Sequence, residues 1–176
     1  KVLWITPMRA LANDIVKSLK MPIQDMGIDW TIESRTGDTT TSQRAKQIKT
    51  MPDVLVTTPE SLTLLMSQKD SKKMFSDVRC VVIDEWHELL SSKRGVMAEL
   101  ALARLRTWNK KLKVWGVSAT IGNLEDALQV LLGSNKKKKS KIVEGIQSKE
   151  IVIDSIIPDT IERFPWAGHI GLKLLP

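Results

Sequence analysis

Cysteine is almost absent from this sequence, since Cys80 is the only one among 176 residues. A lone cysteine excludes an intrachain disulfide and suits a reducing, intracellular setting. Because Cys80 lies inside an apolar run, we expect it to be a small buried hydrophobic side chain. No apolar run approaches the roughly 20 residues that a membrane-spanning helix needs, so no membrane association is expected.

Acidic residues are fewer than basic residues, but the resulting excess of positive charge is concentrated in one short segment. The net charge is +7, and five lysines between positions 136 and 141 account for most of it. These lysines follow a Gly-Ser-Asn turn, which favours a solvated loop over a phosphate-contacting patch, although both interpretations stay open. With 42% hydrophobic and 27% charged residues, the chain has the composition of a globular domain.

The most informative stretch is a short apolar run that ends in acidic residues. Residues 80–83 are C-V-V-I, and Asp84, Glu85 and then His87 follow at once. Such a run predicts a strand buried on both faces, as in a parallel sheet, where ligands bind beyond the carboxyl ends of the strands. Two adjacent acids there favour a metal ion or a phosphate-bound cation. The alternative is an acidic strand end that caps the next helix.

Three further apolar runs, at residues 2–5, 53–56 and 113–117, also end in small polar clusters. Helical periodicity between the runs predicts an α/β fold, a three-layer parallel sheet flanked by helices, with all four clusters along one edge. Thr-Pro pairs at positions 6–7 and 58–59 predict helix starts with threonine as the N-cap. A short strand is expected at residues 30–34. Helices are expected at residues 42–49 and 95–108, and a last helix is expected to end at residue 132. Core packing is expected for Trp4, Trp108 and Trp115. Base stacking is left open for Trp30 and Trp166.

Taken together, the polar clusters resemble the motifs of superfamily 2 helicases. The D-E-W-H sequence at 84–87 resembles the D-E-x-H box, and S-A-T at 118–120 resembles motif III. T-P-M-R-A-L at 6–11 resembles motif Ia, while R-T-G-D at 35–38 and T-P-E at 58–60 resemble the motif Ib region. Together with K-R-G at 93–95, these sequences are most similar to the large helicase-related (Lhr) family, in particular its bacterial branch associated with DNA ligase.

The resemblance implies roles for the residues of the box and of motif III. Asp84 would bind Mg²⁺ through water, and Glu85 would orient and deprotonate the water that attacks ATP. His87 would hydrogen-bond toward motif III, where Ser118 and Thr120 would couple hydrolysis to movement along the strand. The alternatives are a satisfied polar histidine and a simple strand-end turn.

The resemblance also implies a path for one nucleic-acid strand along the other clusters. The residues expected to line it are Thr6, Pro7, Arg9, Gly37, Asp38, Thr58, Pro59 and Glu60. Hydroxyls, backbone N–H groups and arginine position a strand through its phosphates without reading its sequence. For the two threonines, an N-cap is the alternative explanation.

One motif of the family is missing from the sequence. None of the nine glycines is followed by lysine, so no G-x-x-x-x-G-K-[ST] phosphate loop is present. We therefore expect a fragment: the first RecA-like lobe at residues 1–132, a basic linker at 133–150 and the start of a second lobe at 151–176. The resemblance implies a DNA helicase that uses ATP and Mg²⁺ to move along single-stranded or partly duplex DNA, with RNA as a second possible substrate, and the fragment alone is expected to be inactive.

Two other function classes are compatible with the same residues. One is a degenerate RecA-like adaptor without catalysis, and the other is a metal-dependent phosphohydrolase or nuclease built on Asp84 and Glu85. For the helicase, the resemblance implies DNA ligase or repair proteins as candidate partners and a bacterial, cytoplasmic, nucleoid-associated location.

Overall fold

The computed structural model describes residues 1–119, 121–133 and 140–145. The chain divides into two units, Lys1–Ser140 and Lys141–Pro176. In the second unit only residues 141–145 are described, and they form neither a helix nor a strand. The predicted second-lobe segment at 151–176, including Trp166, and the lysines at 136–139 lie outside the described residues. No helix in the described ranges combines the length and the apolar character needed to cross a membrane.

The first unit is built on one parallel sheet of five strands in the order β2-β3-β1-β4-β5. The strands are β1 (Val2–Ile5), β2 (Ile32–Arg35), β3 (Val54–Thr57), β4 (Cys80–Ile83) and β5 (Lys113–Gly116). The helices between them are α1 (Arg9–Asp25), α2 (Thr41–Lys49), α3 (Pro59–Met66), α4 (Ser71–Phe75), α5 (Trp86–Leu89), α6 (Lys93–Trp108) and α7 (Leu124–Leu132). The expected parallel α/β sheet is confirmed.

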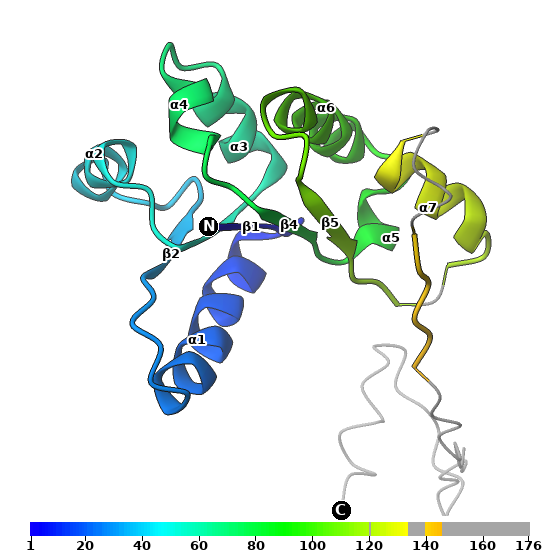
Figure 1. Cartoon of the computed structure of the whole chain (residues 1–176), viewed down its shortest axis with the longest axis horizontal. Coiled ribbons are helices and arrows are strands. Elements are labelled where there is room, and N and C mark those ends of the chain that lie inside the picture. The colour runs from blue at the N-terminus through cyan, green and yellow to red at the C-terminus, as the bar shows by residue number, and fades with distance from the viewer. Residues whose placement is uncertain (120, 134–139, 146–176) are drawn as a thin grey trace, which may run out of the picture. The chain divides into compact units, whose positions relative to one another are not determined.

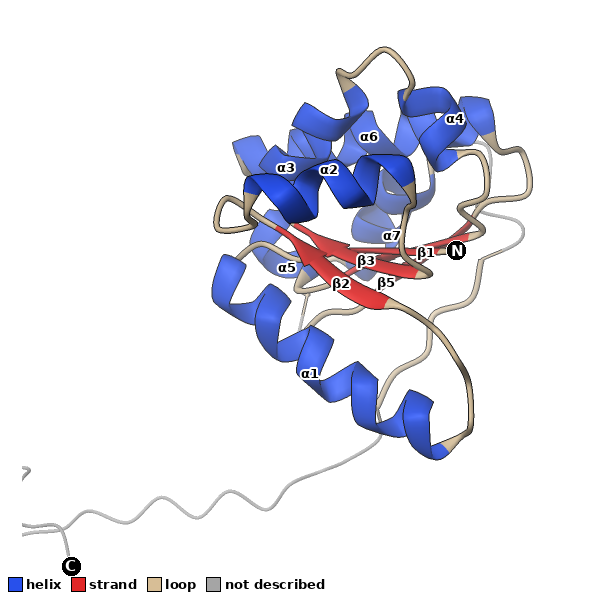
Figure 2. Ribbon diagram, turned by 90° about the vertical axis from the view of Figure 1, so that its left-hand side faces the viewer, coloured by secondary structure: helices blue, strands red, loops and turns tan. Residues whose placement is uncertain are grey.

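Helices cover both faces of the sheet, and each face has its own apolar cluster (Figures 1 and 2). On one face Leu3, Ile5, Leu55 and Ile83 are fully buried in the cluster that α3, α6 and α7 complete. On the other face Ala12 and Ile15 of α1 pack against a smaller cluster from β2, β3 and β1. Alternation along each strand divides the side chains between the two faces, because successive residues point to opposite sides.

The helix starts agree with the sequence at one Thr-Pro pair and not at the other. Thr58 caps α3 by accepting a hydrogen bond from the backbone of Ser61, with Pro59 in the first turn, as predicted. The helix start predicted at Thr6 and Pro7 is wrong, because the N-cap of α1 is Met8. Thr6 instead prolongs the sheet, donating its backbone N–H to the carbonyl of Thr57 at 3.0 Å.

Two further expectations about the core, those for Trp115 and Cys80, need correction. Trp115 on β5 is 63% exposed and not in the core. In register it aligns with Val82 and, through Val82, with Trp4, so it lies on the α1 side of the sheet. Helix α1 packs on β1, β2 and β3 and leaves β5 uncovered on that side. Cys80, on the same side, is only partly buried, and that burial raises the pKa of its thiol.

Candidate catalytic and nucleic-acid rim

The carboxyl ends of the strands meet at one edge of the sheet, which we call the rim. Hydrogen bonds between backbone groups tie the strand ends together there: Asp84 N–H donates to Ile5 O at 2.8 Å, and Val117 N–H donates to Ile83 O at 2.8 Å. Trp86 N–H then donates to Val117 O at 3.0 Å. The rim therefore brings the acidic end of β4 beside the Ser118 segment that follows β5, as the sequence predicted.

The acidic pair begins at an unusual backbone turn. Glu85 has φ 48° and ψ 47°, a left-handed conformation that is uncommon for residues other than glycine. Its N–H donates to Oδ1 of Asp84 at 3.0 Å, so the turn folds the backbone onto the preceding carboxylate. Both acids remain partly exposed. Strained residues of this kind concentrate at functional sites, where the surrounding structure holds them in place.

His87 connects the acidic pair to the segment after β5. Its backbone N–H donates to Oγ of Ser118 at 3.1 Å, and its Nδ1 lies 3.0 Å from the same oxygen. The backbone N–H of Ala119 also lies within hydrogen-bonding distance of Nδ1, at 3.4 Å. Oε2 of Glu85 lies 3.4 Å from Nδ1, a contact that is an ion pair only when the ring is protonated. Thr120 lies outside the described residues.

The rim fits a magnesium ion that keeps most of its water. Mg²⁺ is usually held by one or two carboxylates together with substrate phosphates, and Asp84 offers a partly exposed carboxylate at a strand end. Within the described part of the chain, no three histidine, cysteine or acidic residues are grouped to hold a metal. Asp84 is thus suited to a hydrated, nucleotide-bound ion, whereas the closed ligand set of a metal-only hydrolytic site is not found among these residues.

Beyond β1 and β2, the rim carries an exposed ion pair. Arg9 at the start of α1 contacts Asp38 with Nη1 to Oδ1 at 3.0 Å, and both side chains are 63% exposed. Gly37 lies directly beneath this pair, because a Cβ added there would stand 3.1 Å from Cζ of Arg9. A nucleic-acid phosphate approaching Arg9 would compete with Asp38 for its guanidinium.

The turn that holds Gly37 and Asp38 is fixed by a residue that the sequence analysis left without a role. Arg44 of α2 donates to three carbonyls of the turn, those of Thr39 at 2.8 Å, Thr36 at 3.1 Å and Gly37 at 2.8 Å. These three carbonyls therefore find their hydrogen-bond donor in a side chain of α2. The sequence signal was an arginine one turn into a helix that follows a G-D turn, but many exposed helix arginines share that description.

A second unpredicted contact joins two parts of the rim. Nε of Arg94 lies 2.6 Å from Oε1 of Glu60, and Nη1 of Arg94 donates to the carbonyl of Pro7 at 3.2 Å. The first turn of α6 is therefore attached both to the segment after β1 and to the start of α3. Glu60, which was expected on the nucleic-acid path, has an arginine partner.

The remaining predicted contact residues are buried. Thr6 and Thr58 are 0% and 4% exposed, and Pro7 and Pro59 are also classed as buried. Oγ1 of Thr6 has no hydrogen-bond partner within the described residues. Direct side-chain contact with a strand does not fit these four residues in this conformation, so they support the rim from beneath.

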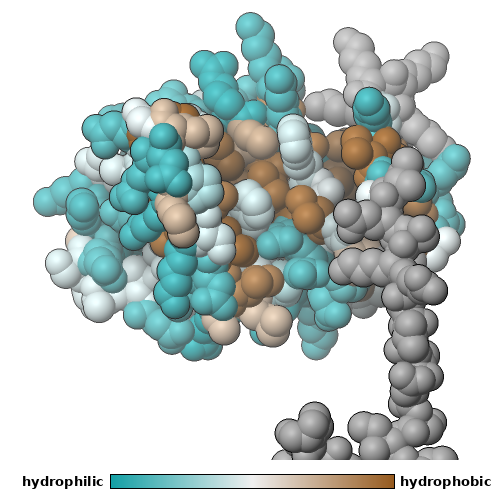
Figure 3. All heavy atoms as spheres, turned by 90° about the horizontal axis from the view of Figure 1, so that it is seen from below, coloured by the Kyte–Doolittle hydropathy of each residue, from teal (hydrophilic) through white to brown (hydrophobic). Residues whose placement is uncertain are grey.

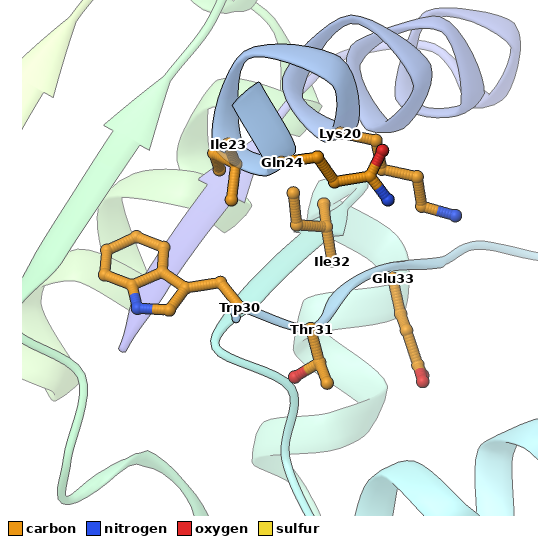
Figure 4. Close-up of a pocket in the computed structure, with 7 residues that line it drawn as sticks. All are labelled: Lys20, Ile23, Gln24, Trp30, Thr31, Ile32 and Glu33. Carbon is orange, nitrogen blue, oxygen red and sulfur yellow. The ribbon is translucent and has the colours of Figure 1, made fainter. Parts of the chain in front are cut away.

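Trp30, left open as a base-stacking residue, lies elsewhere. It lines a hollow of about 300 Å³ with Lys20, Ile23, Gln24 and the first residues of β2 (Figure 4). This hollow is at the amino end of β2, whereas the rim is at the carboxyl ends of the parallel strands. Trp30 is consequently not part of the rim.

Comparison with known proteins agrees with this geometry. Residues 1–127 match the DEAD/DEAH box helicase family. The chain belongs to that family. It is 37% identical over 167 residues to the ATP-dependent helicase Lhr-Core of Methanothermobacter thermautotrophicus, covering 89% of the chain and 19% of that relative. It is also 32% identical over 144 residues to the Lhr helicase/uracil glycosylase of Escherichia coli, covering 76% of the chain and 9% of the relative.

Solved structures give the same result for the fold. The Mycobacterium smegmatis helicase Lhr bound to single-stranded DNA and AMP-PNP superposes with a TM-score of 0.68 at 34% identity, covering 76% of this chain and 19% of the other. The DUF1998 helicase MrfA bound to DNA and AMP-PNP gives a TM-score of 0.66 at 26% identity, with 76% and 19% covered. The RecA-like fold and the resemblance to Lhr helicases are therefore confirmed. The chain spans about a fifth of the length of the first curated relatives.

Proposed function

We propose that this chain is part of the first RecA-like lobe of an ATP-dependent helicase that moves along single-stranded nucleic acid, with DNA as the expected substrate. The observation that carries the proposal is the contact between His87 and Ser118, which joins the acidic end of β4 to the segment after β5. An acid pair whose neighbouring histidine is bonded to a second strand end is what a motor needs in order to relay its chemical state.

In this proposal each residue of the rim has a defined task. Glu85 orients and deprotonates the attacking water, and Asp84 holds the hydrated cation that accompanies ATP. That cation, when bound, neutralises charge that develops on the phosphates during transfer. His87 transmits displacement of Glu85 to Ser118, because its Nδ1 lies 3.4 Å from Oε2 of Glu85 and 3.0 Å from Oγ of Ser118. The predicted role of Thr120 beside Ser118 belongs to the same proposal.

The nucleic-acid strand is proposed to pass over Arg9 and the turn at Gly37 and Asp38. Support comes from the exposure of the Arg9–Asp38 pair and from the Arg44 clamp beneath the turn. Because phosphate contacts dominate such binding, affinity should fall steeply with salt. Replacing Arg9 by alanine should weaken binding of a labelled oligonucleotide and make that binding less sensitive to salt.

The decisive experiment uses the complete protein. Glu85→Gln should lower nucleic-acid-stimulated ATP hydrolysis by at least about 100-fold while ATP binding is retained, because only the proton-accepting group is lost. Ser118→Ala should retain hydrolysis and lose strand displacement. Undiminished hydrolysis in the Glu85→Gln protein would overturn the proposal.

The 176-residue chain has its own test, because its sequence contains no phosphate loop. We expect no ATP hydrolysis above background from the purified chain, since no other segment of the sequence offers the same backbone cradle and lysine. Hydrolysis by this chain that Glu85→Gln abolishes would contradict this expectation.

The same purified proteins distinguish the proposed helicase from the two other function classes. An adaptor would bind strands but show no hydrolysis in the complete protein, and a nuclease would cut labelled single strands in Mn²⁺. Our proposal further places the protein in the bacterial cytoplasm, in DNA repair, with DNA ligase or repair proteins as partners. Co-purification of tagged protein with a ligase would test that partnership.

A further inference from the structure

The carboxylate of Asp84 is held by two donors, one in the turn after β4 and one on β1. The N–H of Glu85 donates to Oδ1 at 3.0 Å, and the indole Nε1–H of Trp4 donates to Oδ2 at 3.3 Å. Trp4 lies 80 positions earlier in the sequence, on β1. Each oxygen of the carboxylate therefore has one fixed N–H partner.

The sheet register explains why Trp4 can reach this carboxylate. Trp4 aligns with Val82 on the neighbouring parallel strand, and Asp84 is two residues further on, so both side chains lie on the same face. The backbone N–H of Asp84 donates to Ile5 O at 2.8 Å, which fixes the main chain at that point. The indole ring packs against the apolar cluster beneath α1, and this packing sets its direction.

This arrangement determines where the free lone pairs of Asp84 point. A carboxylate has about four lone-pair positions, and an indole N–H can donate but cannot accept. With one position on each oxygen occupied, the carboxylate cannot rotate without losing a bond. Partners of this kind around a metal-binding carboxylate typically change metal affinity by about 10–100-fold when they are removed.

We propose that Trp4 is a positioning residue that orients Asp84 toward the hydrated cation. The inference rests on the proposed function only for the identity of that cation. The sequence pattern predicts only core packing for Trp4. Its ring does pack against the cluster beneath α1, and its N–H in addition donates to Asp84 at the rim. Trp115, on β5, is a matched control because it lies on the same face of the sheet as Trp4. No hydrogen bond of its indole N–H is found among the described residues, and its side chain is exposed.

The contact itself can be tested in the 176-residue chain by NMR of the tryptophan indole N–H groups. Trp4→Phe removes one indole signal and thereby assigns it. Asp84→Ala should then move the Trp4 signal to lower proton chemical shift and speed its exchange with solvent, whereas Asp38→Ala should leave it in place. A Trp4 signal that ignores Asp84→Ala, with the other indole signals unchanged, would overturn the proposal.

The consequence can be tested in the complete protein through metal binding. Trp4→Phe should weaken Mn²⁺ binding to the ATP-loaded protein, followed by electron paramagnetic resonance, and raise the half-saturating Mg²⁺ concentration for hydrolysis about 10-fold. Trp115→Phe should change neither value. Equal metal binding by wild type and Trp4→Phe would refute the positioning role while leaving the helicase proposal intact. If Glu85→Gln still hydrolysed ATP, the helicase proposal would fail whatever Trp4 does.

Discussion

Arginine side chains hold the rim together through backbone carbonyls and carboxylates. Arg44 bonds three carbonyls of the turn at residues 36–39, and Arg94 bonds Glu60 and the carbonyl of Pro7. The planar guanidinium presents several donors in a fixed geometry, so a single side chain can satisfy several acceptors. Since these contacts lie beside the exposed Arg9–Asp38 pair, they set the shape of the proposed nucleic-acid surface.

Arg44→Ala should destabilise the turn at residues 36–39 more than the rest of the molecule. Three carbonyls lose a charged donor, and we expect a loss of about 2 kcal/mol in the free energy of unfolding. Urea unfolding measures this loss, and hydrogen exchange at residues 36–40 locates it. Lys46→Ala is the control on the same helix, because Lys46 makes one exposed contact to Glu33 at 3.5 Å. Equal losses for both variants would contradict the clamp.

Asp53 should make the stability depend on pH. Hydrogen bonds from the backbone and the hydroxyl of Thr31 lower the pKa of this carboxyl. Because the folded pKa lies below the unfolded value of about 3.9, the stabilisation is present above that value and is lost as the pH falls through the folded pKa. Asp53→Asn should therefore lower the unfolding free energy by about 1 kcal/mol at pH 7.

The measurement is urea unfolding of wild type and Asp53→Asn at pH 7 and near pH 3. The difference between the two proteins should shrink at the lower pH, because below about pH 3.9 the carboxyl of the unfolded wild-type chain takes up a proton and the unfolded state gains stability. Asp29→Asn, in the loop before β2 that also carries Thr31, serves as the control and should change little at either pH. A difference that stays constant with pH would show that the carboxylate charge contributes nothing.

At the scale of elements, the sequence predicted the buried strands well and the element ends less well. β1, β3 and β4 agree with their apolar runs to within a residue because both faces of each strand are covered. The start of α1 was misplaced because Thr6 bonds to Thr57, a partner 51 positions away that no local signal reveals. The exposure of Trp115 was missed for a similar reason, since burial depends on which helix covers the strand.

In the candidate site too, the residues that local sequence identifies were predicted, and those defined by tertiary contacts were not. Asp84, Glu85, His87 and Ser118 were predictable because each directly follows a recognisable strand. Arg44, Arg94 and the Trp4 indole were not assigned roles, because their partners are 5 to 87 positions away and become neighbours only once the sheet and helices are assembled. Local pattern identifies the strand ends, and only tertiary packing identifies the side chains that hold them.

Gly95 should be essential for the packing of α6 against α5. A Cβ at this position would stand 2.0 Å from the carbonyl oxygen of Leu89, a backbone atom that cannot move aside easily. Gly95→Ala should lower the unfolding free energy by about 3 kcal/mol, as overpacking does in a tight core. Thermal unfolding measures it, with Gly122→Ala as the control because nothing lies within 4 Å of a Cβ there. Equal stability of the two variants would disprove the close contact.

At the scale of the whole molecule, the face of the sheet on the α1 side carries exposed apolar side chains at β5 and just after it. Among the described residues β5 pairs with β4 alone, and Trp115 and Val117 are 63% and 45% exposed. On the face seen from below, where α1 lies, apolar side chains gather in the middle (Figure 3). An unpaired edge strand with apolar neighbours is a template for pairing with another chain.

We therefore expect the 176-residue chain to associate with itself as its concentration rises. Light scattering on a dilution series should show a mean mass above that of the monomer at high concentration. Trp115→Lys should restore the monomer, because a lysine on an edge strand opposes pairing. Leu64→Lys is the control, since Leu64 is 66% exposed on α3, outside the β5 edge. A monomeric wild type at every concentration, or equal relief by both variants, would show that the β5 edge does not drive association.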